Sequence, residues 1–335
     1  MSKSAKTKQV LETSVFSFGD PVPVLQGRDL MGFYHSAFNG KYYSPPISWD
    51  SLAKTQNSNP HHQSALEVKT NIIASCYRGH RYLPRQSFKR MVMDHLFFGN
   101  SYLERIRNGL GGTFQLKPPL AKFTRVGKGR YFYLNEIGRE HEFEPGSIFH
   151  LMEPDINQEI YGMPSYLAAL NSALLNESAT LFRRKYYENG SHAGFILHLT
   201  DAMQNPDDIE ALKTAMKNAK GPGNFKNLVV NTPGGKPDGL KVIPIAEVGA
   251  KDEFLNVKNV TRDDVLAAHR VPPQLMGIVP NNTGGFGSVK DAAKVFNRNE
   301  LIPLQTAFKS LNDWMGEKIV SFDDYAIEGL KDEVK

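Results

Sequence analysis

The sequence predicts an α+β fold, and a change of hydrophobic period leads to that prediction. Apolar residues recur at helical spacing over 64–76, and a second helix is predicted over 87–98. Residues 101–107 instead alternate, which is typical of a half-buried strand, and Asn108-Gly109 directly after them is a hairpin signal. Helices followed by short strands and glycine-rich turns indicate an α+β domain that extends to about residue 160.

Further elements are predicted along the chain. Three short strands fit Phe114–Leu116, Tyr131–Leu134 and Ile148–Leu151. A long helix follows, which Ser165 can cap and which ends before Asn189-Gly190.

A small αβ insert comes next. It combines a strand over 194–199, a helix over 206–219, and strands over 227–231 and 240–245. Because it lies between two long helical segments, it is not expected to form the main core.

The last third is predicted to be helical. One helix runs from Asp252, contains a sequence resembling a capping box at 261–264, and ends at Val271-Pro-Pro273. After a glycine-rich loop over 280–287, Ser288 caps a helix that is expected to continue to about Ile319. Pro303 is expected to kink that last helix.

Residues 1–60 are predicted to form an extended arm, because five prolines interrupt any long helix or central strand. The arm carries too many aromatic residues for a free tail. It is expected to dock on another surface, with packing on its own domain as the alternative.

Composition sets limits on the class of protein. A chain of 335 residues with 40% hydrophobic residues can build about two domains. The single cysteine, Cys76, excludes an intrachain disulfide framework and is interpreted as a small core residue. No apolar run approaches the ~20 residues of a membrane-spanning helix, so a soluble, cytoplasmic protein is expected.

Motifs for common chemistries are missing. No phosphate-binding loop, zinc-protease motif or serine-nucleophile elbow occurs, and the adjacent pair His61-His62 lies in a loop-like stretch. Paired acids occur at 207–208, 263–264 and 323–324. The first two pairs are interpreted as helix-start residues that stabilise the positive end of the helix dipole. Catalytic residues, metal ligands and cofactors are therefore not predicted.

Positive charge is concentrated in the insert although the chain's net charge is only +5. Six lysines and a single acid, Asp238, lie between positions 213 and 241. This cluster is either a solvated face or a surface that faces phosphates or an acidic partner. Its members are Lys213, Lys217, Lys220, Lys226, Lys236 and Lys241. No aromatic residues are interleaved with them, so contact with DNA would involve backbone charge and no base readout.

The order of several short motifs resembles the portal, or head-to-tail connector, family of tailed bacteriophages. The motifs together cover most of residues 90–320. They are Phe98-Gly-Asn-Ser-Tyr-Leu-Glu-Arg105, Phe149-His-Leu151, Tyr161-Gly-Met-Pro-Ser165 with the following helix to Gly190, Val271-Pro-Pro-Gln-Leu-Met-Gly277, and Phe296-Asn-Arg-Asn-Glu-Leu-Ile-Pro303.

This resemblance implies a portal-like ring subunit with a wing, a helical stem, a small αβ clip and a kinked C-terminal helix. The implied parts are an N-terminal arm (1–60), the wing (61–162), a stem helix (163–193), the clip (194–250), a second stem helix (251–277), a tunnel loop (278–287), a kinked wing helix (288–320) and a short tail (321–335). The implied channel residues of the loop are Asn281, Asn282, Thr283, Gly284, Gly285, Phe286 and Gly287, and the lysine cluster would be the clip surface that faces DNA or a partner.

The resemblance also implies the function and partners. The chain would form a cyclic homo-oligomer, usually of twelve subunits, at one capsid vertex of the virion, after assembly in the host cytoplasm. The ring would conduct double-stranded DNA and dock the terminase large subunit, the neck proteins, and capsid and scaffolding proteins. No membrane and no enzymatic activity are expected.

Two other functions stay open from the residues alone. One is a metal-dependent DNA-processing enzyme that uses the acid pairs. The other is an adaptor or scaffold that binds through the lysine-rich insert without forming a ring.

Overall fold

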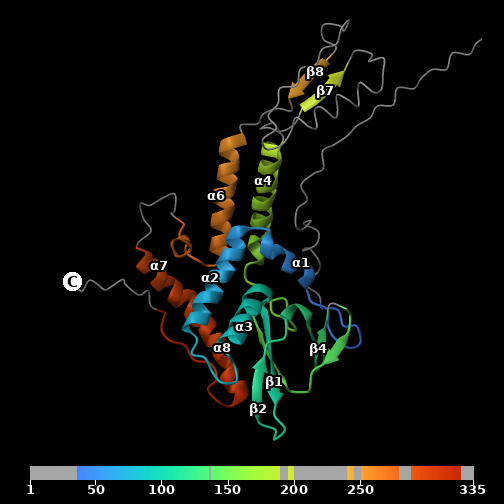
Figure 1. Cartoon of the computed structure of the whole chain (residues 1–335), viewed down its shortest axis with the longest axis vertical. Coiled ribbons are helices and arrows are strands. Elements are labelled where there is room, and N and C mark those ends of the chain that lie inside the picture. The colour runs from blue at the N-terminus through green and yellow to red at the C-terminus, as the bar shows by residue number, and fades with distance from the viewer. Residues whose placement is uncertain are drawn as a thin grey trace, which may run out of the picture. The chain divides into compact units, whose positions relative to one another are not determined.

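A computed structural model describes residues 36–135, 137–188, 195–199, 240–244, 250–278 and 288–325 (Figure 1). The chain divides into two compact units: the larger comprises 23–179 and 249–335, and the smaller comprises 1–22 and 180–248. The larger unit combines helices with two small antiparallel sheets, which confirms the predicted α+β class. No helix among the described residues has the length and hydropathy needed to cross a bilayer.

The first helices are α1 (Trp49–Lys54), α2 (Pro60–Cys76) and α3 (Arg85–Phe98). The side chain of Asn59 caps α2 by accepting hydrogen bonds from the backbone N–H groups of the next two histidines. The prediction that His61-His62 lies in a loop is therefore wrong, because this cap starts the helix four residues earlier than the apolar pattern does. Cys76 is buried at the end of α2, as predicted.

The described part of the predicted arm packs on its own chain. Trp49 is buried, and its ring lies 5.8 Å from that of Phe98 and 5.1 Å from that of Tyr161, centroid to centroid. Residues 36–60 thus pack on their own domain, as the alternative interpretation of the arm predicts. Residues 1–35 of the arm lie outside the described part of the chain.

Two three-stranded antiparallel sheets follow α3. The first has the order β2-β1-β6, and the second has the order β3-β4-β5. The predicted strands are confirmed, and β1 and β2 form the predicted hairpin. The bounds are β1 Asn100–Arg107, β2 Thr113–Lys117, β3 Thr124–Val126, β4 Tyr131–Leu134, β5 Glu140–Glu142 and β6 Ile148–Met152.

Two long helices, α4 (Leu170–Glu188) and α6 (Ala250–Ala268), confirm the predicted helical segments. Their predicted caps are wrong. Ser165 does not cap α4, because a short 3-10 helix over Leu167–Ala169 precedes it and has no side-chain cap. Thr261 lies in the interior of α6, where its hydroxyl donates to the carbonyl of Val257 at 2.6 Å.

The last helical segment has three parts. Ser288 caps α7 (Val289–Phe296) as predicted, a π-helical turn spans Asn297–Leu301, and α8 (Ile302–Met315) ends at Gly316. The helix therefore stops short of the predicted end at Ile319. Pro303 lies in the first turn of α8, and the wider π turn before it accommodates the missing N–H of the proline.

The smaller unit contributes one described strand pair. Strand β7 (Phe195–Leu199) pairs antiparallel with β8 (Leu240–Pro244), and both strands were predicted. The predicted helix over 206–219 and the predicted strand over 227–231 lie outside the described residues.

Two glycines let distant backbones touch in the core. A Cβ at Gly162 would lie 2.0 Å from the carbonyl oxygen of Gly99, and a Cβ at Gly99 would lie 2.5 Å from the carbonyl carbon of Met163. The side chain of Asn100 binds both segments: its Nδ2 donates to the carbonyls of Phe98 and Gly162, and its Oδ1 accepts from the N–H of Gly162, all at 2.8 Å. This contact joins the start of β1 to the segment that leads into α4 (Figure 1).

A buried histidine pair lies between α2 and the end of α6. His62 Nδ1 is 2.9 Å from His269 Nε2, and the ring of Tyr166 covers both imidazoles. Burial lowers the pKa of His62 to about 4 and that of His269, which also faces His62 and Lys69, to about 2. Both imidazoles are therefore neutral at pH 7 in the folded chain.

Substituting Gly162 by Ala tests the backbone contact. The added Cβ meets backbone atoms on both sides, so the free energy of unfolding should fall by about 3 kcal/mol. Urea unfolding followed by circular dichroism measures the change. Gly79→Ala is the matched control, because a Cβ there meets nothing within 4 Å. Equal stability of the two variants would contradict the contact.

The histidine pair predicts acid sensitivity. Because burial lowers the folded-state pKa of His62 to about 4 from the ordinary 6.5, the unfolded chain binds an extra proton between these values. Stability is therefore lost as the pH falls through that window. Between pH 7 and pH 5 the wild-type chain should lose about 2 kcal/mol more unfolding free energy than His62→Gln. The same loss in both chains, measured by urea unfolding, would contradict this assignment.

Candidate functional site

Most of the predicted site residues lie outside the described part of the chain. This applies to the loop residues 281–287 and to five of the six lysines, Lys213, Lys217, Lys220, Lys226 and Lys236. Lys241 is in β8, opposite His198 of β7. The structure does describe what flanks the loop: a 3-10 helix over Pro273–Met276 precedes it, and α7 follows it.

The first half of α4 lies antiparallel to the second half of α6 (Figure 1). Ala169, Ala173 and Val265 form a small buried cluster at this contact, and small side chains allow close approach of the two helices. The amide of the buried Asn176 donates to the hydroxyl of Thr261 at 2.7 Å. The hydroxyl of Thr261 thus provides a hydrogen-bond acceptor for the buried amide of Asn176. This bond fixes the register of α4 against α6.

The predicted role of the acid pair at 263–264 is wrong. These residues lie in the interior of α6, and so they do not stabilise the start of a helix. Asp263 pairs with Arg262 at 2.8 Å, whereas Asp264 accepts from the hydroxyl of Ser172 on α4 at 3.0 Å. Among the residues with described side chains, no three histidines, cysteines or acids gather closely enough to hold a metal ion.

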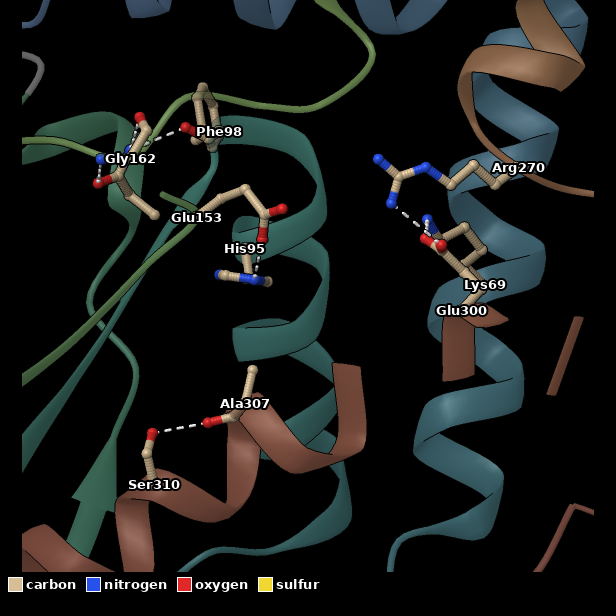
Figure 2. A network of polar contacts seen from close by, with 10 residues as sticks. Lys69, His95, Phe98, Glu153, Gly162, Arg270, Glu300, Ala307 and Ser310 are labelled. Carbon is tan, nitrogen blue, oxygen red and sulfur yellow. Dashed lines mark hydrogen bonds and ion pairs between the residues drawn. The ribbon is translucent and has the colours of Figure 1, made fainter. Parts of the chain in front are cut away.

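A buried ion network joins α2, the end of α6 and the π turn (Figure 2). The ammonium of Lys69 pairs with Glu300 Oε1, and Arg270 Nη1 lies 3.3 Å from Glu300 Oε2. Lys69 also donates to the carbonyl of His269 at 3.3 Å. Burial lowers the pKa of Lys69, and the carboxylate of Glu300 opposes that shift.

A second polar pair lies beside this network. His95 Nε2 is 3.5 Å from Glu153 Oε2 (Figure 2), and this contact with His95 lowers the pKa of Glu153. Both residues line a cavity of about 130 Å³, together with Lys69, Arg270 and Glu300. The cavity has room for more than one water molecule. The positive charges of Lys69 and Arg270 balance the negative charges of Glu153 and Glu300. This arrangement is therefore suited to joining helices rather than to concentrating one sign of charge.

Sequence reasoning missed this junction. The available signal was a charge at an apolar position: Lys69 lies between Leu66 and Ile73 on the buried face of α2, and Glu300 follows Phe296 by four residues. A charged residue in such a position is rarely fully buried without a partner. That signal indicates that a partner exists, but the spacing along the chain does not identify it.

Comparison with known proteins places the chain in a family. The family model described as "Phage portal protein" matches residues 80–327. The probable portal protein of Escherichia phage P2 is 49% identical over 315 residues, which cover 93% of this chain and 92% of that protein. The probable portal protein of Haemophilus phage HP1 is 39% identical over 80% of this chain and 79% of that protein.

Solved structures share the fold at lower identity. A chain in the virion of a native gene transfer agent particle has a TM-score of 0.61 at 20% identity, covering 85% of this chain and 86% of that one. An HK97 family phage portal protein from Corynebacterium diphtheriae has a TM-score of 0.58 at 14% identity, covering 81% of this chain and 94% of that one. With a family match over about three quarters of its length and a relative of nearly the same extent, the chain belongs to the phage portal protein family.

Proposed function

We propose that this chain forms a cyclic homo-oligomer at one capsid vertex and that the ring conducts double-stranded DNA during packaging and ejection. The observation that carries the proposal is the 49% identity to a probable portal protein over 93% of this chain. A related fold occurs in a gene transfer agent neck that was computed with C12 symmetry. A twelve-subunit ring is therefore the assembly that we propose.

The parts of the chain receive roles in that ring. The two sheets with α1–α3, α7 and α8 form the wing, α4 and α6 form the stem, and residues 194–250 form the clip. Exposed apolar side chains on the two stem helices, Leu175 and Val260, support lateral packing of neighbouring stems in the ring. Residues 278–287 form the tunnel loop in this assignment.

The proposed contact with DNA is electrostatic and sparse. DNA must slide through the ring, so contacts to phosphates serve this purpose and base readout does not. The lysine cluster from Lys213 to Lys241 supplies positive charge within the clip while the net charge of the chain is only +5. Around a ring this local excess is repeated by every subunit.

The proposed partners follow from the place of the ring in the virion. The clip docks the terminase large subunit during packaging and the neck proteins afterwards. Capsid and scaffolding proteins contact the ring during its assembly in the host cytoplasm. The terminase provides the energy for packaging, which agrees with the absence of a phosphate-binding loop from this sequence.

Native mass spectrometry of the purified full-length chain tests the ring. The expected result is a closed assembly, with a mass of twelve subunits as in the C12-symmetric neck. Only monomers or dimers at every salt concentration and protein concentration tried would contradict the ring. That outcome, together with retained binding of a partner to the clip, would favour the adaptor alternative.

Deletion of residues 281–287 tests the proposed tunnel loop. The ring should still assemble, whereas capsids that carry the variant should retain less packaged DNA, as measured by DNase protection. A glycine-serine segment of the same length in place of 281–287 is the matched control for chain connectivity. Loss of the ring in both variants would contradict the assignment and identify the segment as part of a subunit interface.

A further inference from the structure

Arg270 occupies a backbone position that favours glycine. Helix α6 ends in a Schellman motif, in which the N–H of Arg270 donates to Ala267 and the N–H of Val271 donates to Leu266. The φ angle of Arg270 is +57°, and it is the one non-glycine residue with a positive φ among the described residues. Helices α3 and α8 end with Gly99 and Gly316 in the same conformation. A long side chain at this position has a conformational cost that glycine avoids.

Glu300 lies in a second backbone irregularity. The π-helical turn Asn297–Leu301 interrupts the hydrogen-bond pattern between α7 and α8. A π turn holds one more residue than an α turn, and such turns occur often at functional sites. In a regular α-helix, a shift of one residue corresponds to a rotation of about 100° and a rise of about 1.5 Å. The π turn therefore determines how α7 is oriented relative to α8.

The two irregularities meet at one ion network. Arg270 and Glu300 pair directly, and Lys69 holds the other carboxylate oxygen from α2 (Figure 2). The side chains of Lys69 and Glu300 are only 4% and 6% exposed, whereas that of Arg270 is 61% exposed. Solvent or a ligand thus reaches this network at Arg270, while the other two members stay buried.

Space for movement lies next to the network. The cavity of about 130 Å³ is lined by the three residues of the network, Lys69, Arg270 and Glu300. Asn299, inside the π turn, and Pro303, just after it, also line this cavity. In a close-packed core, a change of helix register needs such free volume. The buried ring of His95 also lines the cavity, and its Nδ1 has no hydrogen-bond partner. This part of the core is thus less tightly determined than the glycine contact described above.

We propose that Arg270, Glu300 and Lys69 form a latch. The latch connects the π turn between α7 and α8 to the end of α6 and keeps that turn in its observed conformation. When Arg270 releases Glu300, the π turn resolves toward regular helix, and α7 rotates relative to α8. The latch fixes where α7 begins, at Ser288, relative to where α6 ends. Its significance for DNA conduction rests on the proposed function, because the predicted tunnel loop joins the described fold between these two elements.

Hydrogen–deuterium exchange of the full-length chain tests the latch through Arg270→Gly. Glycine suits the αL position, so the melting temperature should stay equal to that of the wild type or rise. The ion pair is lost, so amides of residues 297–301 should exchange about tenfold faster. Arg298→Gln, an exposed change in the same π turn, is the control and should leave exchange unchanged. Wild-type exchange of 297–301 in Arg270→Gly would overturn the latch.

Two further variants separate the latch from simple core stability. Lys69→Met combined with Glu300→Met replaces the buried pair with apolar side chains, and such replacements often preserve stability. The latch predicts that the double Met variant folds but that the amides of its π turn exchange faster than in the wild type. The single variant Arg270→Lys should keep the slow exchange of the wild type, because it keeps the positive charge. Slow exchange in the double Met variant would overturn the proposal.

The role in DNA conduction has its own readout. Rings of Arg270→Gly should assemble normally, but phage carrying this variant should package less DNA than phage carrying Arg298→Gln. If exchange of 297–301 accelerates while packaging is unchanged, the positioning role is overturned. Exchange is measured on the chain in any assembly state, so absence of a ring would contradict the proposed function without deciding the latch.

Discussion

Close contact between two backbone segments at Gly99 and Gly162 is the constraint on which the fold of the larger unit depends. No side chain fits between these segments, and Asn100 satisfies the polar groups of both. The carbonyl of Gly99 also accepts from the N–H of Glu153, whose own carbonyl accepts from Met163. In this way α3, the first sheet and the segment before α4 share one buried hydrogen-bond network. Each unsatisfied group in such a network lowers the free energy of unfolding by about 1–3 kcal/mol. Loss of one hydrogen bond therefore destabilises the elements that share the network.

Local patterns predicted most of the helices and strands. Alternation and the Asn108-Gly109 signal identified the hairpin of β1 and β2, and Ser288 was correctly identified as the cap of α7. One cap was wrong where a tertiary contact uses the same side chain. Thr261 has the sequence of a helix start, yet it lies within α6, where its hydroxyl accepts from the amide of Asn176. This contact joins residues 85 positions apart, so a short sequence window cannot predict it.

The junction at Glu300 could not have been predicted for a related reason. Lys69 and Glu300 are separated by 231 residues. Taken alone, each of them is a charged residue that interrupts the apolar face of a helix. The π turn that brings Glu300 inward has no reliable sequence signal, and Arg270 stands where the helix-ending rule expects glycine. These local rules fail at the same place in three dimensions. Departures from local rules that gather in this way are expected at functional or strained sites.

In the proposed function this chain is the subunit of a portal ring. Cryo-electron microscopy of the capsid vertex in DNA-filled particles tests this role. We expect one ring of this chain at a single vertex, with the stem helices α4 and α6 around an axial channel that contains DNA density. A vertex ring whose density does not fit this chain, or the presence of this chain at every vertex, would contradict it.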